Sequence, residues 1–176
     1  MSEEKLEVTK TSLEGVLRIK PPTVFEDFRG SYVETYNEKL YRDSGIDEKF
    51  VQDDFSVSSQ NVLRGIHGDT VTTKLISCTI GRIYLVIINW DSRSAQFGHW
   101  EAFTLSEQNR FQILVPPNHG VGHLVLTPQA VFSYKQSTYY DRRSQFTLIW
   151  NDPKLGIWWP VESPVISRRD QGLEGR

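Results

Sequence analysis

Four side chains in this 176-residue chain are of the types that move protons or stabilise charge: His67, Lys74, Tyr134 and Asp170. An imidazole is the usual general base near neutral pH, and a phenol, ammonium or carboxylate can complete such a site. His67 lies between two nearby glycines, which allow a ligand to approach closely. Each residue also has an ordinary structural explanation, as a solvated strand residue, a barrel-filling ring or a tail charge. The residue types alone therefore indicate proton chemistry without establishing it.

A metal site is the sharpest competing prediction for these residues. Such sites need ligands on neighbouring strand positions, for example two histidines at i and i+2 followed by a carboxylate. Asp69 stands two residues after His67, but the next eight residues contain neither His nor Glu. His119 and His123 lie in an apparent loop, where an ordinary and a functional role are equally open, and His99 is expected at the surface. We expect no bound metal.

Other reaction classes lack their motifs. The chain contains no Gly-x-Ser-x-Gly nucleophile turn, no Gly-x-Gly-x-x-Gly and no phosphate-binding Gly-Lys-Ser/Thr loop. Cys78 stands in an apolar strand pattern, where an inert thiol is expected. The net charge of −2 and the absence of a Lys/Arg block argue against nucleic-acid binding.

Length and composition predict a single domain spanning residues 1–176. A hydrophobic content of 38% and an aromatic content of 12% are enough for a sizeable core. The lone cysteine suits a reducing compartment, and neither a signal peptide nor a membrane-spanning run is visible. These features predict a cytoplasmic protein that does not bind membranes.

Short β-rich runs separated by turn residues must position the candidate side chains. In the run that begins at Phe132, residues 132, 134, 136 and 138 share one face. Closely spaced strands with few helix signals predict an all-β sandwich or barrel, which can enclose a small ligand. Helices are expected only at Glu38–Ser44 and after Asp170. The predicted strands are Asp54–Arg64, Lys74–Ile80, Arg82–Asn89, Trp100–Leu105, Phe111–Val115, His123–Leu126, Val131–Tyr140 and Gln145–Trp150.

Four segments in this order resemble the dTDP-4-dehydrorhamnose 3,5-epimerase family of the cupin superfamily. The resemblance runs from about Phe25 to Asp170 and implies a cupin jelly-roll β-barrel. The segments are Phe25–Glu34 (FEDFRGSYVE), Phe50–Ser58 (FVQDDFSVS), Val62–His67 (VLRGIH) and Ile149–Pro160 (IWNDPKLGIWWP), followed by Ser167–Asp170 (SRRD).

The resemblance implies that the enzyme inverts C3 and/or C5 of a nucleotide-linked 4-keto sugar without metal or cofactor, because the substrate's ketone acidifies the neighbouring carbons. His67 is then the base, and Asp170 orients its imidazole. Tyr134 delivers a proton from the opposite face, and Lys74 stabilises negative charge on the C4 oxygen. The expected role is in surface-polysaccharide biosynthesis.

The same resemblance assigns the remaining substrate contacts. Ser56 and Arg64 are expected near the sugar and diphosphate, with Gln52 nearby, and Tyr140 shapes the sugar pocket. The family exchanges N-terminal strands in a dimer. Arg29 and Glu34 are therefore expected to reach the nucleotide of a neighbouring subunit in a homodimer.

This chain departs from the family pattern at several positions that the sequence places around the nucleotide sugar. The loop after His67 is shorter, and the family's usual aspartates are replaced by Leu85 and Asn89. Asp54 replaces a usual asparagine. In Asn118–His123 the family's histidine corresponds to Val121 in strict register, or to His123 after a two-residue slip, and His123 is included among the expected substrate contacts.

The segments Arg64–Asp69 (RGIHGD) and Pro116–Asn118 (PPN) resemble a branch that acts on GDP-linked 4-keto heptoses, so both a GDP-linked heptose and a dTDP-linked deoxyhexose are candidate substrates. Three other functions remain open. A 3,4-ketoisomerase would share the fold but move the carbonyl group, a non-catalytic protein would only bind sugar nucleotides, and a metal-dependent oxygenase would bind a metal.

Overall fold

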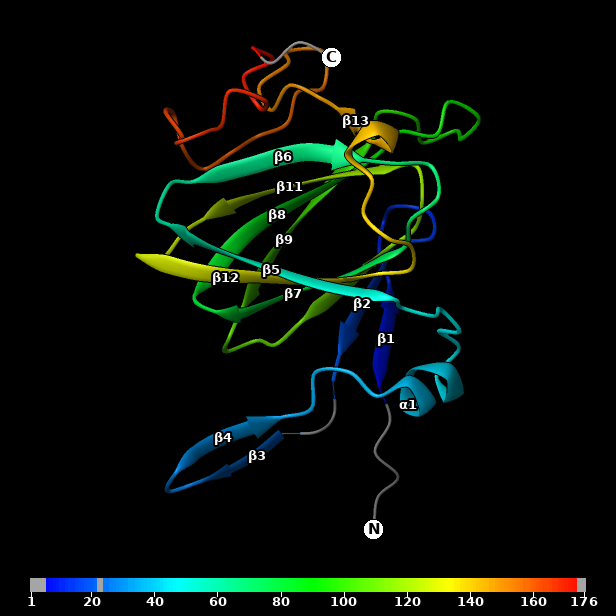
Figure 1. Ribbon diagram of the computed structural model, residues 1–176, viewed down its shortest axis with the longest axis vertical. Coiled ribbons are helices and arrows are strands. Elements are labelled where there is room, and N and C mark those ends of the chain that lie inside the picture. Colours follow the sequence, from blue (N-terminus) through cyan, green and yellow to red (C-terminus); the bar gives the residue numbers. More distant parts are fainter. Residues whose placement is uncertain (1–5, 22–23, 174–176) are drawn as a thin grey trace.

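The computed structural model describes residues 6–21 and 24–173, which form two facing antiparallel sheets and a separate hairpin (Figure 1). The six-stranded sheet has the order β1(Glu7–Lys10), β2(Leu17–Lys20), β10(Gln112–Val115), β7(Lys74–Ile80), β12(Gln129–Gln136), β5(Gln52–Ser59). The five-stranded sheet has the order β13(Phe146–Thr147), β6(Leu63–Gly68), β11(His119–Val125), β8(Arg82–Asn89), β9(Trp100–Ser106). The hairpin pairs β3(Val24–Asp27) with β4(Gly30–Val33).

Helical structure is confined to short segments in the described part of the chain: α1(Glu38–Asp43) and the 3₁₀ turn η1(Arg142–Ser144). The side chain of Asn37 accepts the N–H of Leu40 and so caps α1. No helix among the described residues has the length and apolar character needed to span a bilayer. The predicted all-β class is confirmed.

The two sheets bury an apolar core between them, and a second apolar layer lies outside the five-stranded sheet. Between the sheets, Ile76, Ile83 and Leu85 are among the side chains with almost no exposed surface. Outside β6, β8 and β11, the segment that follows β13 packs Trp159 against Leu63 and other residues of those strands. This packing fixes the C-terminal segment against the barrel.

The strands differ from the sequence prediction at a few places. The run Asp54–Arg64 forms two strands, because Asn61 has a φ of 64° and turns the chain between β5 and β6. The region predicted as a loop around His119 belongs to β11, and within Gln145–Trp150 only Phe146–Thr147 is a strand. After Asp170 the described chain makes turns rather than a helix, and residues 174–176 lie outside the described ranges.

The inner face of the six-stranded sheet is a regular array of side chains that forms one wall of a cavity. Register places Tyr134 of β12 between Ile76 of β7 and Asp54 of β5. Because side chains on a strand alternate between faces, the rows on either side also point inward. The neighbouring rows are Lys74, Gln136 and Gln52 on one side and Cys78, Phe132 and Ser56 on the other. The predicted shared face is confirmed for Phe132, Tyr134 and Gln136, which all line the cavity. Thr138, predicted on the same face, lies beyond the end of β12 and does not line it.

Candidate active site

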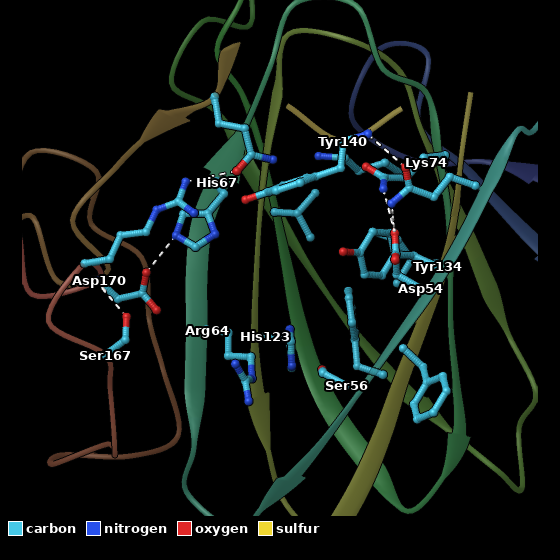
Figure 2. Close-up of a pocket in the computed structure, with 18 residues that line it drawn as sticks. Asp54, Ser56, Arg64, His67, Lys74, His123, Tyr134, Tyr140, Ser167 and Asp170 are labelled. Atoms are coloured by element: carbon cyan, nitrogen blue, oxygen red, sulfur yellow. Dashed lines mark hydrogen bonds and ion pairs between the residues drawn. The ribbon is translucent and has the colours of Figure 1, made fainter. Parts of the chain in front are cut away.

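A cavity of about 470 Å³ opens between the two sheets, and all four predicted catalytic residues line it (Figure 2). The predicted substrate contacts Gln52, Ser56, Arg64, His123 and Tyr140 line it as well. Its remaining lining residues are Asp54, Phe55, Ile76, Val121, Phe132, Gln136, Gln145, Ser167 and Arg169. Residues far apart in sequence thus meet in one hollow of a size that suits a small ligand.

His67 and Asp170 form a hydrogen-bonded pair on one wall. The His67 Nε2 and Asp170 Oδ1 atoms are 2.7 Å apart, and the backbone N–H of Gly65 donates to Asp170 Oδ2 over 3.3 Å. Burial opposes ionisation of Asp170, but hydrogen bonds from His67, Gly65 and Ser167 outweigh it and lower its pKa. An ionised carboxylate can only accept, so Nε2 carries the proton and Nδ1 is left as the basic nitrogen.

The C-terminal segment delivers Asp170 to this pair. Val165 bridges to Val62 in parallel, and Leu63 N–H donates to the Val165 carbonyl over 3.0 Å. A turn follows, in which the N–H of Asp170 donates to Ser167 Oγ over 3.2 Å. The Asp170 side chain is therefore buried at the edge of the cavity although its segment runs outside the sheet (Figure 2).

A β-bulge in β6 turns both Arg64 and His67 toward the cavity. Residues three apart on a regular strand would face opposite sides. Here Arg64 pairs with His123 and His67 pairs with Val121, so β6 has one residue more than β11 over this interval. Gly65 makes the bulge possible, since its φ is +108° and a Cβ would lie 2.5 Å from the Val121 carbonyl oxygen.

Tyr134 faces His67 from the opposite sheet (Figure 2). Burial, with a smaller contribution from the charge of Asp54, raises the pKa of Tyr134 to about 12. The phenol is therefore protonated at neutral pH and can act as a proton donor. A base and an acid thus project from two different walls of the same cavity.

Lys74 lies at the end of β7 and places a cation in the cavity. Its Nζ atom is 3.6 Å from Asp69 Oδ2. Burial lowers the pKa of Lys74, and the Asp69 carboxylate opposes this shift. Asp69 also accepts the N–H groups of Val71 and Thr72. Asp69 therefore holds the loop after His67 in shape and forms an ion pair with Lys74. Within residues 6–21 and 24–173, no cluster of metal-ligating side chains is found.

Arg64, Ser56 and His123 lie together at the end of the cavity away from Lys74 (Figure 2). The Arg64 Nε atom donates to Ser58 Oγ over 3.0 Å, and the His123 ring stacks on Phe132 at 4.0 Å between centroids. Within the described chain, Ser56 Oγ and His123 Nε2 are buried without a hydrogen-bond partner. This end therefore offers unsatisfied polar atoms and a guanidinium to a ligand.

In β11 the structure separates His119 from Val121 and His123, the two positions considered for the family's histidine. Val121 and His123 both line the cavity, so the choice between them stays a prediction, whereas His119 at the start of β11 does not line it. His119 Nδ1 instead bonds to the Pro117 carbonyl at 3.0 Å. Burial, followed by the charges of Arg64 and His67, lowers the pKa of His123 to about 3. His123 is thus a neutral ring at neutral pH.

Arg29 and Glu34 do not line the cavity. Arg29 is in the turn of the β3–β4 hairpin, where it pairs with Asp27 at 2.6 Å, and Glu34 follows β4. The hairpin extends away from the barrel (Figure 1). Within one chain, Arg29 and Glu34 therefore lie apart from the cavity that the other predicted site residues line.

Two of the sequence departures do not concern the cavity, contrary to the prediction. Leu85 is fully buried in the core between the sheets, and Asn89 is buried at the end of β8, where its side chain bonds to Ser94 Oγ and accepts the N–H of Asp91. Conversely, the sequence prediction missed Gln136, Gln145 and Arg169 as lining residues. For Gln136 a signal was present, because it shares the inward face of Phe132 and Tyr134, whereas Gln145 and Arg169 lie outside regular strands.

Comparison of the sequence with known proteins gives matches to one family of epimerases. A family model described as dTDP-4-dehydrorhamnose 3,5-epimerase matches residues 10–175. The dTDP-4-dehydrorhamnose 3,5-epimerase of Salmonella typhimurium is 37% identical over 168 residues, which cover 93% of this chain and 91% of that protein. The protein of the same name from Neisseria gonorrhoeae is 38% identical over 168 residues and 94% of this chain, which spans only 51% of that longer protein.

Solved structures show the same likeness. The crystal structure of a dTDP-6-deoxy-D-glucose-3,5-epimerase from Legionella pneumophila, in complex with dTDP-4-keto-L-rhamnose, superposes with a TM-score of 0.89. It is 33% identical in sequence, and the match covers 95% of this chain and 90% of that one. The predicted cupin jelly roll is thereby confirmed.

Burial of His123 predicts a specific acid sensitivity. The folded-state pKa of about 3 is below the ordinary value of 6.5, so the unfolded chain binds the proton first as the pH falls. His123 therefore costs folding stability progressively from about pH 6.5 downward, on the order of a few kcal/mol at the acid end. Urea unfolding of His123→Phe should show a shallower loss of stability between pH 7.5 and 4.5 than the unmodified protein.

His99→Phe is the matched control, because His99 is exposed. This variant should keep the slope of the unmodified protein. Equal slopes for all three proteins would mean that His123 titrates normally in the folded state.

Proposed function

Because the chain belongs to the dTDP-4-dehydrorhamnose 3,5-epimerase family, and is therefore an isomerase, we propose that it inverts the carbons flanking the ketone of a dTDP-linked 4-keto-6-deoxyhexose. The observation that carries this proposal is the hydrogen-bonded His67–Asp170 pair on one wall, with Tyr134 on the facing wall of the same cavity. Inversion at a carbon requires proton removal on one face and delivery on the other.

In the first step, His67 Nδ1 takes the proton from C3 or C5. The electron pair of the broken C–H bond becomes the C=C bond of an enolate, and the carbonyl π electrons move to the C4 oxygen. Lys74 is the nearby cation assigned to stabilise this oxyanion. Asp170 holds the imidazole in the tautomer that leaves Nδ1 free and stabilises the imidazolium that forms.

In the second step, the phenol of Tyr134 protonates the same carbon from the opposite face and the C4 carbonyl re-forms. The phenolate then regains a proton from water, and His67 releases its own. Tyr134 suits this role because its raised pKa of about 12 keeps the phenol protonated before each turnover. The substrate's ketone serves as the electron sink, so the scheme needs no cofactor.

The charges of the cavity support an anionic ligand at one end. In the described chain no Asp or Glu forms an ion pair with Arg64, although Arg64 lines the cavity. Arg64 lies beside Ser56 and His123, whose buried polar atoms are unsatisfied. We assign the diphosphate to this end, with Gln52 and Tyr140 at the sugar end, because guanidinium groups match phosphate oxygens.

The nucleotide itself is proposed to be dTDP, since the relatives compared above are named for dTDP sugars. The GDP-heptose branch expected from the sequence gains no support from these comparisons and stays a prediction. A cytoplasmic enzyme supplying surface-polysaccharide synthesis likewise stays a prediction.

Exchange with solvent tests the proposal directly. Incubation with a dTDP-linked 4-keto-6-deoxyhexose in D₂O should incorporate deuterium at C3, C5 or both, and NMR should find the ketone still at C4. A parallel incubation with a GDP-linked 4-keto heptose should be slower. Migration of the ketone to C3 would identify a 3,4-ketoisomerase, and binding without exchange on either sugar would identify a non-catalytic protein.

Loss of His67 should slow solvent exchange more than loss of the Tyr134 hydroxyl. His67→Asn removes the base, so exchange should fall by roughly 10²–10⁴-fold or more while dTDP binding by calorimetry changes little. Tyr134→Phe should be less severe at the carbon where water can replace the phenol as the donor. His99→Asn, an exposed position, is the control, and full exchange in His67→Asn would overturn the assignment of the base.

The hairpin residues lead us to propose a homodimer with exchanged N-terminal strands. Phe25, Phe28 and Tyr32 of the β3–β4 hairpin are 60%, 99% and 67% exposed, which is unusual for large apolar side chains so close together. In a second copy, the hairpin could bring Arg29 and Glu34 to a nucleotide that their own chain does not reach.

Mixed subunits test this arrangement. If Arg29 serves the partner's site, a 1:1 mixture of refolded His67→Asn and Arg29→Ala chains should recover about a quarter of full activity, because half the dimers are hybrids with one intact site. Arg93→Ala is the matched control, since Arg93 also pairs with an aspartate two residues earlier. No recovery above the separate variants would contradict the exchanged dimer.

A further inference from the structure

Two glutamine amides hold the side chain of Asp54, which lies beside Tyr134 on the cavity wall formed by the six-stranded sheet. Gln52 Nε2 and Gln136 Nε2 each donate to Asp54 Oδ2 over 2.8 Å (Figure 2). Gln52 is fixed in turn, because its Oε1 atom accepts the N–H of Tyr140 over 2.9 Å. Donors on β5 and β12 thus set the direction in which the carboxylate points.

Both of these hydrogen bonds end on the same oxygen. Among the residues that the structure describes, Asp54 Oδ1 receives no hydrogen bond, and no Lys or Arg forms an ion pair with the carboxylate. The neighbouring Asp53 differs, because it lies on the outer face of the sheet and pairs with Lys135 at 2.7 Å. When a ligand displaces water from the cavity, the free oxygen of Asp54 must obtain a donor from that ligand or remain unsatisfied at a cost.

The chemistry of the free oxygen restricts what can occupy this position. A carboxylate only accepts hydrogen bonds, and its negative charge repels phosphate oxygens. Asp54 lies one row away from Ser56, so a diphosphate bound at the Arg64 end leaves the sugar ring beside Asp54 and Tyr134. A sugar hydroxyl is the donor available at this row.

We propose that Asp54 is a specificity-determining residue that accepts a hydrogen bond from the C2 hydroxyl of the bound sugar. This inference rests on the proposed function. In a 4-keto-6-deoxyhexose, C1 carries the diphosphate, C4 has no hydroxyl, C6 is a methyl group, and C3 and C5 are the carbons that change configuration. Only the C2 hydroxyl keeps its direction throughout the reaction, and a rigidly held acceptor can stay bonded only to such a group.

The consequence is selection against sugars that lack this hydroxyl. The asparagine expected here from the family resemblance would offer an N–H donor together with its acceptor. Asp54 offers acceptor atoms alone, so its preference for a hydroxyl should be stricter.

The test compares two sugars in two proteins. The ligands are dTDP-6-deoxyglucose, which lacks the ketone and cannot react, and its 2-deoxy analogue, with binding measured by calorimetry. The unmodified protein should bind the 2-deoxy analogue roughly 10- to 100-fold more weakly, as for loss of a hydrogen bond to a charged group. In Asp54→Asn, whose carbonyl can still accept from both glutamines, the two sugars should bind within about threefold of each other.

Asp53→Asn makes the same charge change on the outer face and should keep the preference of the unmodified protein. The inference is overturned if the unmodified protein binds both sugars equally, or if Asp54→Asn weakens both by the same factor. Failure of the proposed function gives a different result, namely an intact C2 preference without any deuterium incorporation from the matching 4-keto sugar.

Discussion

The hydrogen bond between His67 and Asp170 connects two parts of the chain that lie 103 residues apart, and the proposed chemistry depends on it. It fixes the imidazole tautomer, so one ring nitrogen is committed to the carboxylate and the other is free. For the bond to fix this tautomer, the carboxylate must stay ionised although it is buried, and the hydrogen bonds from Gly65 and Ser167 assist this. The apolar packing of Trp159 outside the five-stranded sheet is thus part of the site, since it holds the segment that carries Asp170.

Two facing sheets suit a reaction that needs opposite faces of one ring. His67 belongs to β6 and Tyr134 to β12, and the core between the sheets fixes their separation. A close-packed core resists relative movement of the walls, so neither group has to be positioned by a loop. The charges divide along the same cavity, with Lys74 in one row, Asp54 in the next and Arg64 at the far end (Figure 2). This order gives an asymmetric ligand a single favourable orientation.

Strand alternation made the wall around Tyr134 predictable, because every second residue of a regular strand faces the same side. The first half of β11 was predicted as a loop, since its glycines resemble turn signals, whereas the strand predicted from His123 onward is present. Their actual role is packing: a Cβ at Gly120 would lie 2.6 Å from Ile66, and one at Gly122 would lie 2.9 Å from the same side chain. The bulge was unpredictable for another reason, since it appears only when β6 is paired with its neighbour.

The role of Asp170 was accessible through family resemblance alone, because its segment has no regular pattern to reveal where it ends. Arg169 and Gln145 were missed for the same reason. Leu85 and Asn89 were assigned to the cavity by analogy, but the fold places Leu85 in the core and Asn89 at the buried end of β8. Family resemblance was enough to predict the residues that are proposed to react with the substrate. The residues that surround them could be assigned only once the pairing of the strands and the path of the C-terminal segment were known.

The bulge at Gly65 has a consequence for how this stretch can change over time. If β6 kept its present length but paired regularly with β11, one of the two side chains would rotate out of the hollow. Substitutions of Gly65, whose conformation permits the bulge, should therefore be eliminated during divergence, whereas the exposed turn around Arg93 can vary in length. Arg64, Gly65 and His67 are thus inherited as a unit, even where the amino acids around them drift.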